Sequence, residues 1–165
     1  DLLLEAYCKY QNSTNKVNIK ITLIGDHRKK NDFDSKQYLL SSSKKLRDKS
    51  MLSYQGPVFG QDKWRELSKF DILIQPSRSE GMPLTVIEAM SIGIPCIVSK
   101  ETNMGEIINE AKCGWVINAT VDDLFKTFNK IESFHKITLA KMGLNGMRYS
   151  KKKLNWNEVS KINYL

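Results

Sequence analysis

Residues 70–99 have the sequence FDILIQPSRSEGMPLTVIEAMSIGIPCIVS, in which two short apolar runs flank a polar loop and a stretch with helical spacing. The apolar runs, residues 71–75 and 94–99, predict buried β-strands, and the second is richer in β-branched side chains. Pro83 stands between them and favours the first position of a helix, where its missing N–H costs no hydrogen bond. A strand, a helix and a second strand of these lengths predict a βαβ unit whose two strands are parallel neighbours.

The predicted helix begins at Pro83 and stops at Gly93, and Pro95 follows as a second helix breaker. Its side toward the sheet should be apolar, because a crossover helix packs back onto the strands that it connects. By helical spacing this face is predicted to hold Leu84, Ile87 and either Met90 or Ser91.

The loop before this helix is the predicted functional site. In parallel sheets, ligands bind beyond the carboxyl ends of the strands, and the loop PSRSEGM, residues 76–82, leaves the first strand at that end. Glu80 lies in this loop, and Glu88 lies eight positions later in the helix. Gly81, which has no Cβ and tolerates positive φ, lets the backbone approach a ligand closely.

The start of the helix adds a predicted anion site. The amides of Met82, Leu84 and Thr85 lie there, where unpaired N–H groups and the helix dipole attract negative charge. Glu88 is placed past the first turn, in reach of a ligand's hydroxyls. A phosphorylated, hydroxyl-rich ligand such as a nucleotide sugar would use all of these groups. The alternative is an ordinary βαβ unit in which Glu80 and Glu88 are only solvated.

Glu80 and Glu88, with seven residues between them, resemble the E-x7-E signature of retaining glycosyltransferases with the GT-B fold. The family most similar to this sequence is family 4 of those enzymes, the glycosyl transferases group 1. The surrounding sequence PSRSEGMPLTVIEAMSIGIP, residues 76–95, fits the family pattern, as do LLLEAY and ITLIG near the start of the chain. The resemblance implies a doubly wound, Rossmann-like α/β domain with a parallel sheet, the C-terminal, donor-binding half of a GT-B protein.

The resemblance also implies roles for single residues. Glu80 would be the catalytic carboxylate that holds the donor sugar, and Glu88 would bind the ribose of the nucleotide. The donor would be a UDP-hexose or a UDP-N-acetylhexosamine, bound with no metal and no other cofactor. The base would lie beside Pro57, Val58 and Phe59, although plain packing is an equal alternative for Phe59. The donor sugar and the phosphates would be bound by Gly81, Met82, Pro83, Leu84 and Thr85.

The rest of the chain repeats the alternation of strands and helices. We expect a single nucleotide-sugar-binding domain over residues 1–165, without internal repeats. The predicted strands are residues 17–24, 51–55, 71–75, 94–99 and 115–118. The predicted inward faces of the other helices are Leu3, Ala6, Tyr7 and Tyr10; Trp64, Leu67 and Ser68; Leu124, Phe125, Phe128 and Ile131; and Leu139, Met142 and Met147.

Composition narrows the class of protein. The 165 residues are 41% apolar and 27% charged, which is ordinary for a globular protein, and no run predicts a membrane span or a signal peptide. The net charge is +8, but no recognition motif accompanies it, so nucleic-acid binding is not expected.

Lysine clusters such as residues 151–153 predict solvated faces or a peripheral contact with anionic lipid at the inner face of the cytoplasmic membrane. Three cysteines without metal spacing, one of them Cys96 in a predicted buried strand, favour a reduced, cytoplasmic protein.

Two further features are assigned no function. Asp32-Phe33-Asp34 matches D-x-D, the metal-binding signature of a different glycosyltransferase fold, but its charged loop is not near the other site residues, and we expect no metal there. The only histidines, His27 and His135, neighbour no Ser or Cys motif and are expected at the surface.

In the family, the acceptor-binding domain and the cations that hold the diphosphate precede the helix that opens here at Asp1. We therefore expect them upstream, and we expect the chain alone to transfer no sugar. The whole enzyme would act on a glycan or a polyprenyl-diphosphate-linked acceptor in bacterial surface polysaccharide (O-antigen or capsule) biosynthesis. Two alternatives remain open: a non-catalytic nucleotide-binding or interaction module, and half of a GT-B nucleotide-sugar epimerase.

Overall fold

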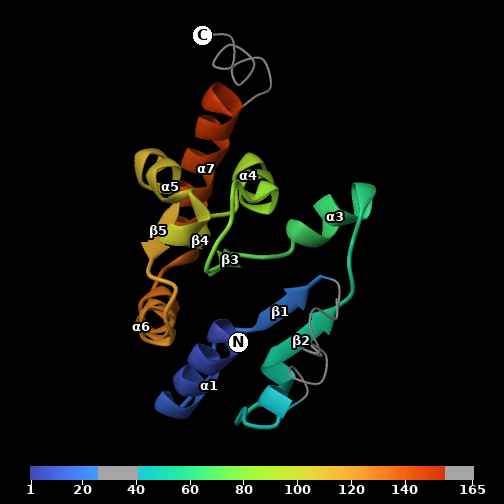
Figure 1. Cartoon of the computed structure of the whole chain (residues 1–165), viewed down its shortest axis with the longest axis vertical. Coiled ribbons are helices and arrows are strands. Elements are labelled where there is room, and N and C mark those ends of the chain that lie inside the picture. Colours follow the sequence, from blue (N-terminus) through green and yellow to red (C-terminus); the bar gives the residue numbers. More distant parts are fainter. Residues whose placement is uncertain (26–40, 155–165) are drawn as a thin grey trace. The chain divides into compact units, whose positions relative to one another are not determined.

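The protein is an α/β structure with parallel strands, and the computed structural model describes residues 1–25 and 41–154 (Figure 1). The predicted α/β class with parallel strands is confirmed. By their contacts the residues form two compact units, which we call unit 1 and unit 2. Unit 1 comprises Asp1–Trp64 and Thr120–Ser133, and unit 2 comprises Arg65–Ala119 and Phe134–Leu165.

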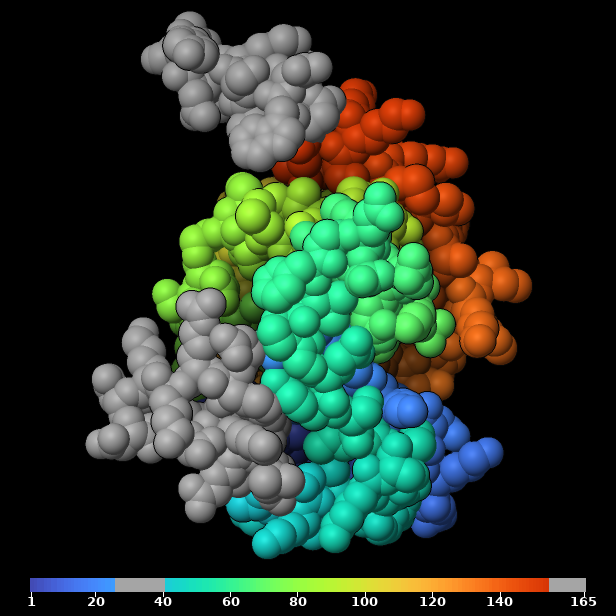
Figure 2. Space-filling model, turned by 90° about the vertical axis from the view of Figure 1, so that its right-hand side faces the viewer, coloured from blue at the N-terminus to red at the C-terminus, as the bar shows by residue number. Residues whose placement is uncertain are grey.

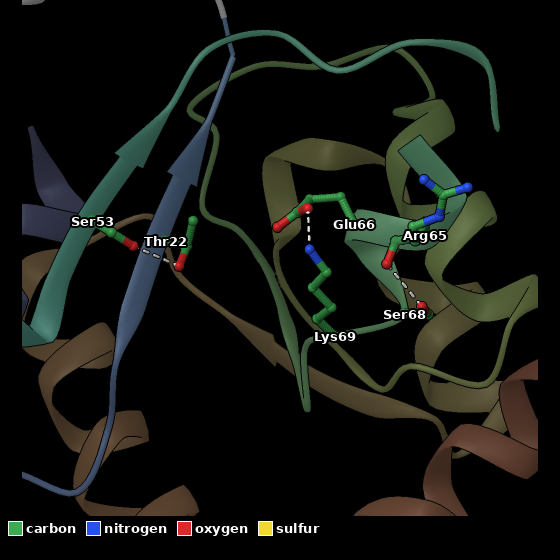
Figure 3. A network of polar contacts seen from close by, with 6 residues as sticks. All are labelled: Thr22, Ser53, Arg65, Glu66, Ser68 and Lys69. Atoms are coloured by element: carbon green, nitrogen blue, oxygen red, sulfur yellow. Dashed lines mark hydrogen bonds and ion pairs between the residues drawn. The ribbon is translucent and has the colours of Figure 1, made fainter. Parts of the chain in front are cut away.

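Unit 1 contains a two-stranded parallel sheet. Strand β1, Ile21–Ile24, pairs with β2, Leu52–Gln55, along their whole lengths. The hydroxyls of Thr22 and Ser53 lie 2.8 Å apart and form a hydrogen bond between the strands (Figure 3). The first strand is shorter than predicted, because β2 offers its neighbour no partner before its own first residue. A short 3-10 turn, η1 at Lys49–Met51, takes that place.

Two helices cover the core of unit 1. Helix α1, Leu2–Ser13, packs against α6, Val121–Glu132. The rings of Tyr7, Tyr10 and Phe128 meet between them, with centroids 5.7 to 6.0 Å apart. All three residues are fully buried, as the helical spacing predicted.

The buried face of α1 differs from the prediction at its two ends. Leu4, rather than Leu3, is buried, and the buried face continues past Tyr10 to Gln11. The buried Gln11 amide is satisfied by the backbone of Asp48: its Nε2 donates to the Asp48 carbonyl at 3.1 Å, and its Oε1 accepts from the Asp48 N–H at 2.9 Å. A polar residue can be buried when both of its groups are paired in this way.

Unit 2 is built on a three-stranded parallel sheet of order β3-β4-β5. Every residue of the central strand β4 is buried. The prediction that residues 71–75 and 94–99 form parallel neighbours is confirmed. The strands are β3, Leu73–Gln75; β4, Cys96–Ser99; and β5, Gly114–Ile117, and the helices that connect them are α4, Leu84–Ser91, and α5, Gly105–Ala111.

Helix α4 buries the predicted Met90, and Ile87 is half-buried against the core, but the predicted Leu84 is not buried. Val86, Ala89 and Met90 are fully buried, whereas Leu84 is 65% exposed. The octapeptide LTVIEAMS is apolar on two sides, so periodicity alone could not choose between them. The side that packs on the core leaves Leu84 in solvent at the start of the helix.

Both ends of α4 have identifiable causes. Pro83 is the N-cap in an extended conformation, so the helix begins one residue later than predicted. Gly93, at φ 82°, ends the helix as predicted. Its N–H donates to the Met90 carbonyl at 3.1 Å, and the Ile94 N–H donates to the Ala89 carbonyl at 2.9 Å. These two bonds form a Schellman motif, in which a glycine in the left-handed region closes the helix.

Helix α7, Lys136–Lys153, packs against α4 and α5 through small residues (Figure 1). Its buried residues are Gly143, Gly146 and Ser150. A Cβ built on Gly143 would lie 1.8 Å from the Gly93 carbonyl oxygen, so only glycine allows this approach. The predicted face of large side chains is therefore wrong: Leu139 and Met142 are half-buried, and Met147 is 37% exposed.

Helix α3, Gly60–Leu67, buries only Leu67 of the three residues predicted to face inward. Trp64 is 40% exposed, and Ser68 lies beyond the last turn of the helix, also exposed. The polar groups at this end are paired locally (Figure 3): the Ser68 hydroxyl donates to the Arg65 carbonyl at 2.9 Å, and Lys69 pairs with Glu66 at 2.6 Å.

Two predictions fall on residues 26–40, which lie outside the described residues. They concern the D-x-D sequence Asp32-Phe33-Asp34 and His27. Within the described ranges, no helix has both the length and the apolar character needed to cross a membrane.

Candidate functional site

The loop between β3 and α4 holds Glu80 in a defined position. Glu80 is half-buried, and its Oε1 accepts a hydrogen bond from the Ser77 hydroxyl at 3.1 Å and a longer one from the Gln75 Nε2 at 3.4 Å. The same Gln75 amide donates to the Ser77 hydroxyl at 2.9 Å. Oε2 of Glu80 has no hydrogen-bond partner among the described residues. The carboxylate is thus fixed through one oxygen, and the other is open to a ligand.

The turn after β4 fixes the backbone of the same loop. The Glu80 N–H donates to the Glu101 carbonyl at 3.0 Å. The Asn103 Nδ2 donates to the carbonyls of Glu80 and Gly81 at 3.0 and 3.2 Å. A third link runs from the Ser99 hydroxyl to the Ser77 carbonyl. The turn itself is the 3-10 segment η2, Lys100–Thr102.

Asn103 is the residue of this site that sequence reasoning missed. It has φ 54°, in the left-handed region, which asparagine adopts more readily than most residues other than glycine. The signal was present in the polar turn ETNMG, where an asparagine precedes a helix. Its contact with the loop joins residues more than twenty positions apart, and periodicity carries no information about such a pairing.

The start of α4 lies directly after this loop. Pro83 is buried and caps the helix without any side-chain hydrogen bond. Thr85 is exposed, and the side chains of Met82 and Leu84 are 55% and 65% exposed. A helix N-terminus without a side-chain cap presents N–H groups and a positive dipole end to an anion.

Gly81, which was expected to let the backbone approach a ligand closely, does not have a positive φ. A Cβ built on it would meet no atom within 4 Å. The fold of the described residues therefore does not itself require glycine at this position. Open space remains beside the backbone of Gly81.

Glu88 lies in the middle of α4 and is half-buried. The structure thus places Glu80, Gly81, Met82, Pro83, Leu84, Thr85 and Glu88 in one continuous part of unit 2, the loop and first turns of α4.

The predicted base-binding residues belong to unit 1, where they follow β2. Pro57 is exposed, Val58 is half-buried, and Phe59 is 77% exposed. Phe59 is therefore not part of the core of the described residues. Its contact with a base stays a prediction.

The three cysteines are free thiols. Cys96 and Cys113 are buried, and desolvation raises the pKa of both, that of Cys113 to about 11. Among the described residues no cluster of three or more His, Cys, Asp or Glu side chains could hold a metal ion. The expectation of a metal-free site stays a prediction.

A family model described as "Glycosyl transferases group 1" matches residues 1–147 of the chain. The curated relative "UDP-Gal:alpha-D-GlcNAc-diphosphoundecaprenol alpha-1,3-galactosyltransferase" of Escherichia coli is 38% identical over 68 residues, which are 41% of this chain and 15% of that enzyme. The chain therefore matches only a small part of the length of this relative.

Solved structures show the same fold. The C-terminal domain of the glycosyl transferase group 1 family protein LpcC from Francisella tularensis superposes with a TM-score of 0.78 at 19% identity, covering 94% of this chain and 78% of that one. HepE of Anabaena, solved in complex with UDP, gives a TM-score of 0.77 at 17% identity, covering 99% of this chain and 44% of that one. The fold is that of a GT-B glycosyltransferase domain.

Proposed function

The chain belongs to the glycosyl transferases group 1 family, and from that membership we propose that it is the donor-binding half of a retaining glycosyltransferase that uses a UDP-sugar. The Glu80 loop carries the proposal. A carboxylate fixed through one oxygen, with the other open, lies next to a helix start that has no side-chain cap. These are the groups that a sugar joined to a diphosphate requires, because its hydroxyls donate to carboxylates and its phosphates accept from amides.

Each residue has a stated role in this proposal. Glu80 Oε2 and the amides of Gly81 and Met82 hold the sugar, and the space beside Gly81 admits it. Thr85 and the first turn of α4, from Pro83 and Leu84 onward, bind the phosphates. Glu88 accepts hydrogen bonds from the two ribose hydroxyls, and Pro57, Val58 and Phe59 flank the base.

The proposed reaction retains the configuration of the sugar. The acceptor hydroxyl attacks the anomeric carbon from the face that the diphosphate leaves, and the bond from that carbon to the phosphate oxygen breaks. The departing phosphate oxygen takes the proton of the acceptor hydroxyl. In this scheme the protein stabilises the charge that develops on the leaving group through oriented amides. No metal ion is part of the proposal.

Uridine is the proposed base, and a lipid-linked glycan is the proposed acceptor. The E. coli relative is named for UDP-Gal and for a diphosphoundecaprenol-linked acceptor, and HepE was also solved with UDP-glucose. We extend these chemistries to this chain: a UDP-hexose or UDP-N-acetylhexosamine as donor, and a polyprenyl-diphosphate-linked acceptor of bacterial surface polysaccharide synthesis.

Isothermal calorimetry with the purified chain and a panel of nucleotides tests the donor assignment. UDP is expected to bind more tightly than GDP, because the E. coli relative is named for UDP-Gal and HepE was solved with UDP. It is also expected to bind more tightly than UMP, because only UDP places a second phosphate at the start of α4. GDP binding equal to or tighter than that of UDP would contradict the uridine assignment. Equal affinities for UMP and UDP would contradict the phosphate site.

A further inference from the structure

Helix α7 carries positive charge without any compensating acid of its own. Its sequence, KITLAKMGLNGMRYSKKK, contains six lysine or arginine residues and no aspartate or glutamate. The buried side of the helix is made of Gly143, Gly146 and Ser150. The cations therefore lie on the other sides of the helix, toward solvent. Figure 2 shows α7 in orange to red at the surface.

The solvent side of α7 alternates apolar and cationic side chains. Ile137 is 83% exposed and Leu144 is 47% exposed, although both are large and aliphatic. Lys141, Arg148 and Lys152 are exposed. Together with Ile137 and Leu144 they recur every three to four residues, so all five lie on one face of the helix. We call Ile137, Lys141, Leu144, Arg148 and Lys152 the outer face of α7.

A hollow of about 380 Å³ adjoins this face, between α7 and the end of α5. Lys112, Arg148 and Lys152 line it and form no ion pair with any described residue. The one acid beside them, Glu110, is already engaged: the Tyr149 hydroxyl donates to it at 2.6 Å, and Lys153 lies 3.6 Å from it. The charge of the hollow is thus positive.

We infer that the outer face of α7 and this hollow form a docking surface for an anionic lipid bilayer. The cations are complementary to the phosphates of the membrane surface, and the hollow is large enough to receive a lipid head group. The exposed Ile137 and Leu144 would enter the boundary between head groups and acyl chains, while the long stems of lysine and arginine let their charges reach the phosphates. A purely polyanionic partner would explain the cations but not the exposed Ile137 and Leu144 on the same face.

Cosedimentation of the whole chain with vesicles tests this surface. We expect binding to vesicles of phosphatidylcholine mixed with phosphatidylglycerol, and little binding to phosphatidylcholine alone. A triple variant, Lys141→Gln/Arg148→Gln/Lys152→Gln, should weaken partitioning onto the mixed vesicles roughly 100-fold, because each cation near an anionic surface contributes about fivefold. Melting curves of both proteins show whether the variant is folded.

Two further variants make the test specific. Ile137→Ser should weaken binding by a smaller factor, and salt should change that factor little, because apolar insertion is not screened. A control, Lys16→Gln/Lys20→Gln/Lys44→Gln, removes the same charge from exposed positions of unit 1 and should bind like the wild type. Equal losses in the control and the α7 variant would mean that net charge alone attracts the protein, and would overturn the proposal. The proposal would also be overturned if Ile137→Ser bound the vesicles as tightly as the wild type, which would point to a polyanion site. Failure of the wild type to bind anionic vesicles would overturn it as well.

Discussion

At the scale of single residues, the position of Glu80 depends on a partner from the next strand. Asn103 holds the Glu80 and Gly81 carbonyls with its side-chain amide, and its own left-handed backbone aims that amide at the loop. Glu80 is therefore placed by the segments that follow two strands of unit 2. A substitution at Asn103 should change the affinity for any ligand that Glu80 binds.

Replacing Asn103 tests this positioning. Asn103→Gly keeps the left-handed backbone and removes both donated bonds, and Asn103→Asp sets a carboxylate against the same two carbonyls. Each lost neutral hydrogen bond is worth about 1 kcal/mol. Affinity for UDP-glucose, measured by calorimetry, should therefore fall roughly tenfold in Asn103→Gly and further in Asn103→Asp.

Comparing the affinities for UDP-glucose and for UDP shows whether the loop holds the sugar. Both variants should lose less affinity for UDP than for UDP-glucose, because the loop is proposed to hold the sugar. Asn109→Asp, an exposed position on α5, supplies the same change of charge and should leave both affinities unchanged. Wild-type binding of UDP-glucose by Asn103→Asp would show that the loop needs no such anchor.

Sequence reasoning found Glu80 and Glu88 because they lie within one continuous motif. It could not find Asn103, whose role depends on a contact between distant segments. It assigned Gly81 to a close approach of a ligand, and the backbone there does not have the positive φ that a turn glycine often adopts. A glycine can serve a turn or make room for another molecule, and composition does not distinguish the two uses.

At the scale of elements, α7 shows where periodicity misleads. The large side chains predicted an apolar stripe of Leu139, Met142 and Met147, but the helix packs through glycines. Small residues let two backbones approach, and the gain comes from the close contact rather than from apolar area. A search for large apolar residues at helical spacing passes over such a face.

Gly143→Ala should destabilise the protein. The new methyl group would overlap the Gly93 carbonyl oxygen, which belongs to the turn that ends α4 and cannot move without breaking that turn. Overpacking of this kind costs about 1–3 kcal/mol in the free energy of unfolding. Urea unfolding followed by circular dichroism should show a lower midpoint for this variant.

A second glycine provides the control for that experiment. A Cβ at Gly56 would meet nothing within 4 Å, and its φ is not positive, so Gly56→Ala should leave the midpoint unchanged or raise it slightly. If Gly143→Ala unfolds at the same urea concentration as the wild type, α7 does not pack as closely as the structure shows.

At the scale of the whole molecule, the order of strands and helices was predictable. Tight turns and short apolar runs mark each strand, and parallel pairing follows from the crossover helices. The ends of the strands were less predictable. Val17 and Ile19 alternate with polar residues as in a strand, but they precede β1, because the length of a strand depends on the neighbouring strand. A single domain over residues 1–165 stays a prediction, and unit 1 and unit 2 each have their own sheet.

A substitution at Glu88 distinguishes two interpretations of this domain: a nucleotide-sugar site, and an ordinary α/β domain in which Glu88 is only solvated. If its carboxylate accepts bonds from both ribose hydroxyls, those charge-assisted bonds are worth about 1.5–3 kcal/mol. A factor of ten corresponds to about 1.4 kcal/mol. Glu88→Ala should therefore weaken UDP binding roughly 10- to 100-fold, and Glu88→Gln, which keeps the shape and one acceptor oxygen, should fall between the two.

Calorimetric titration of UDP into the wild type and Glu88→Ala, with a melting curve for each, is the most direct test of the proposed donor site. Glu106→Ala, at an exposed position on α5, serves as the matched control and should bind UDP like the wild type. We expect a weaker UDP affinity in Glu88→Ala alone, with both variants folded. Equal UDP affinities in the wild type and a folded Glu88→Ala would show that Glu88 does not bind the nucleotide.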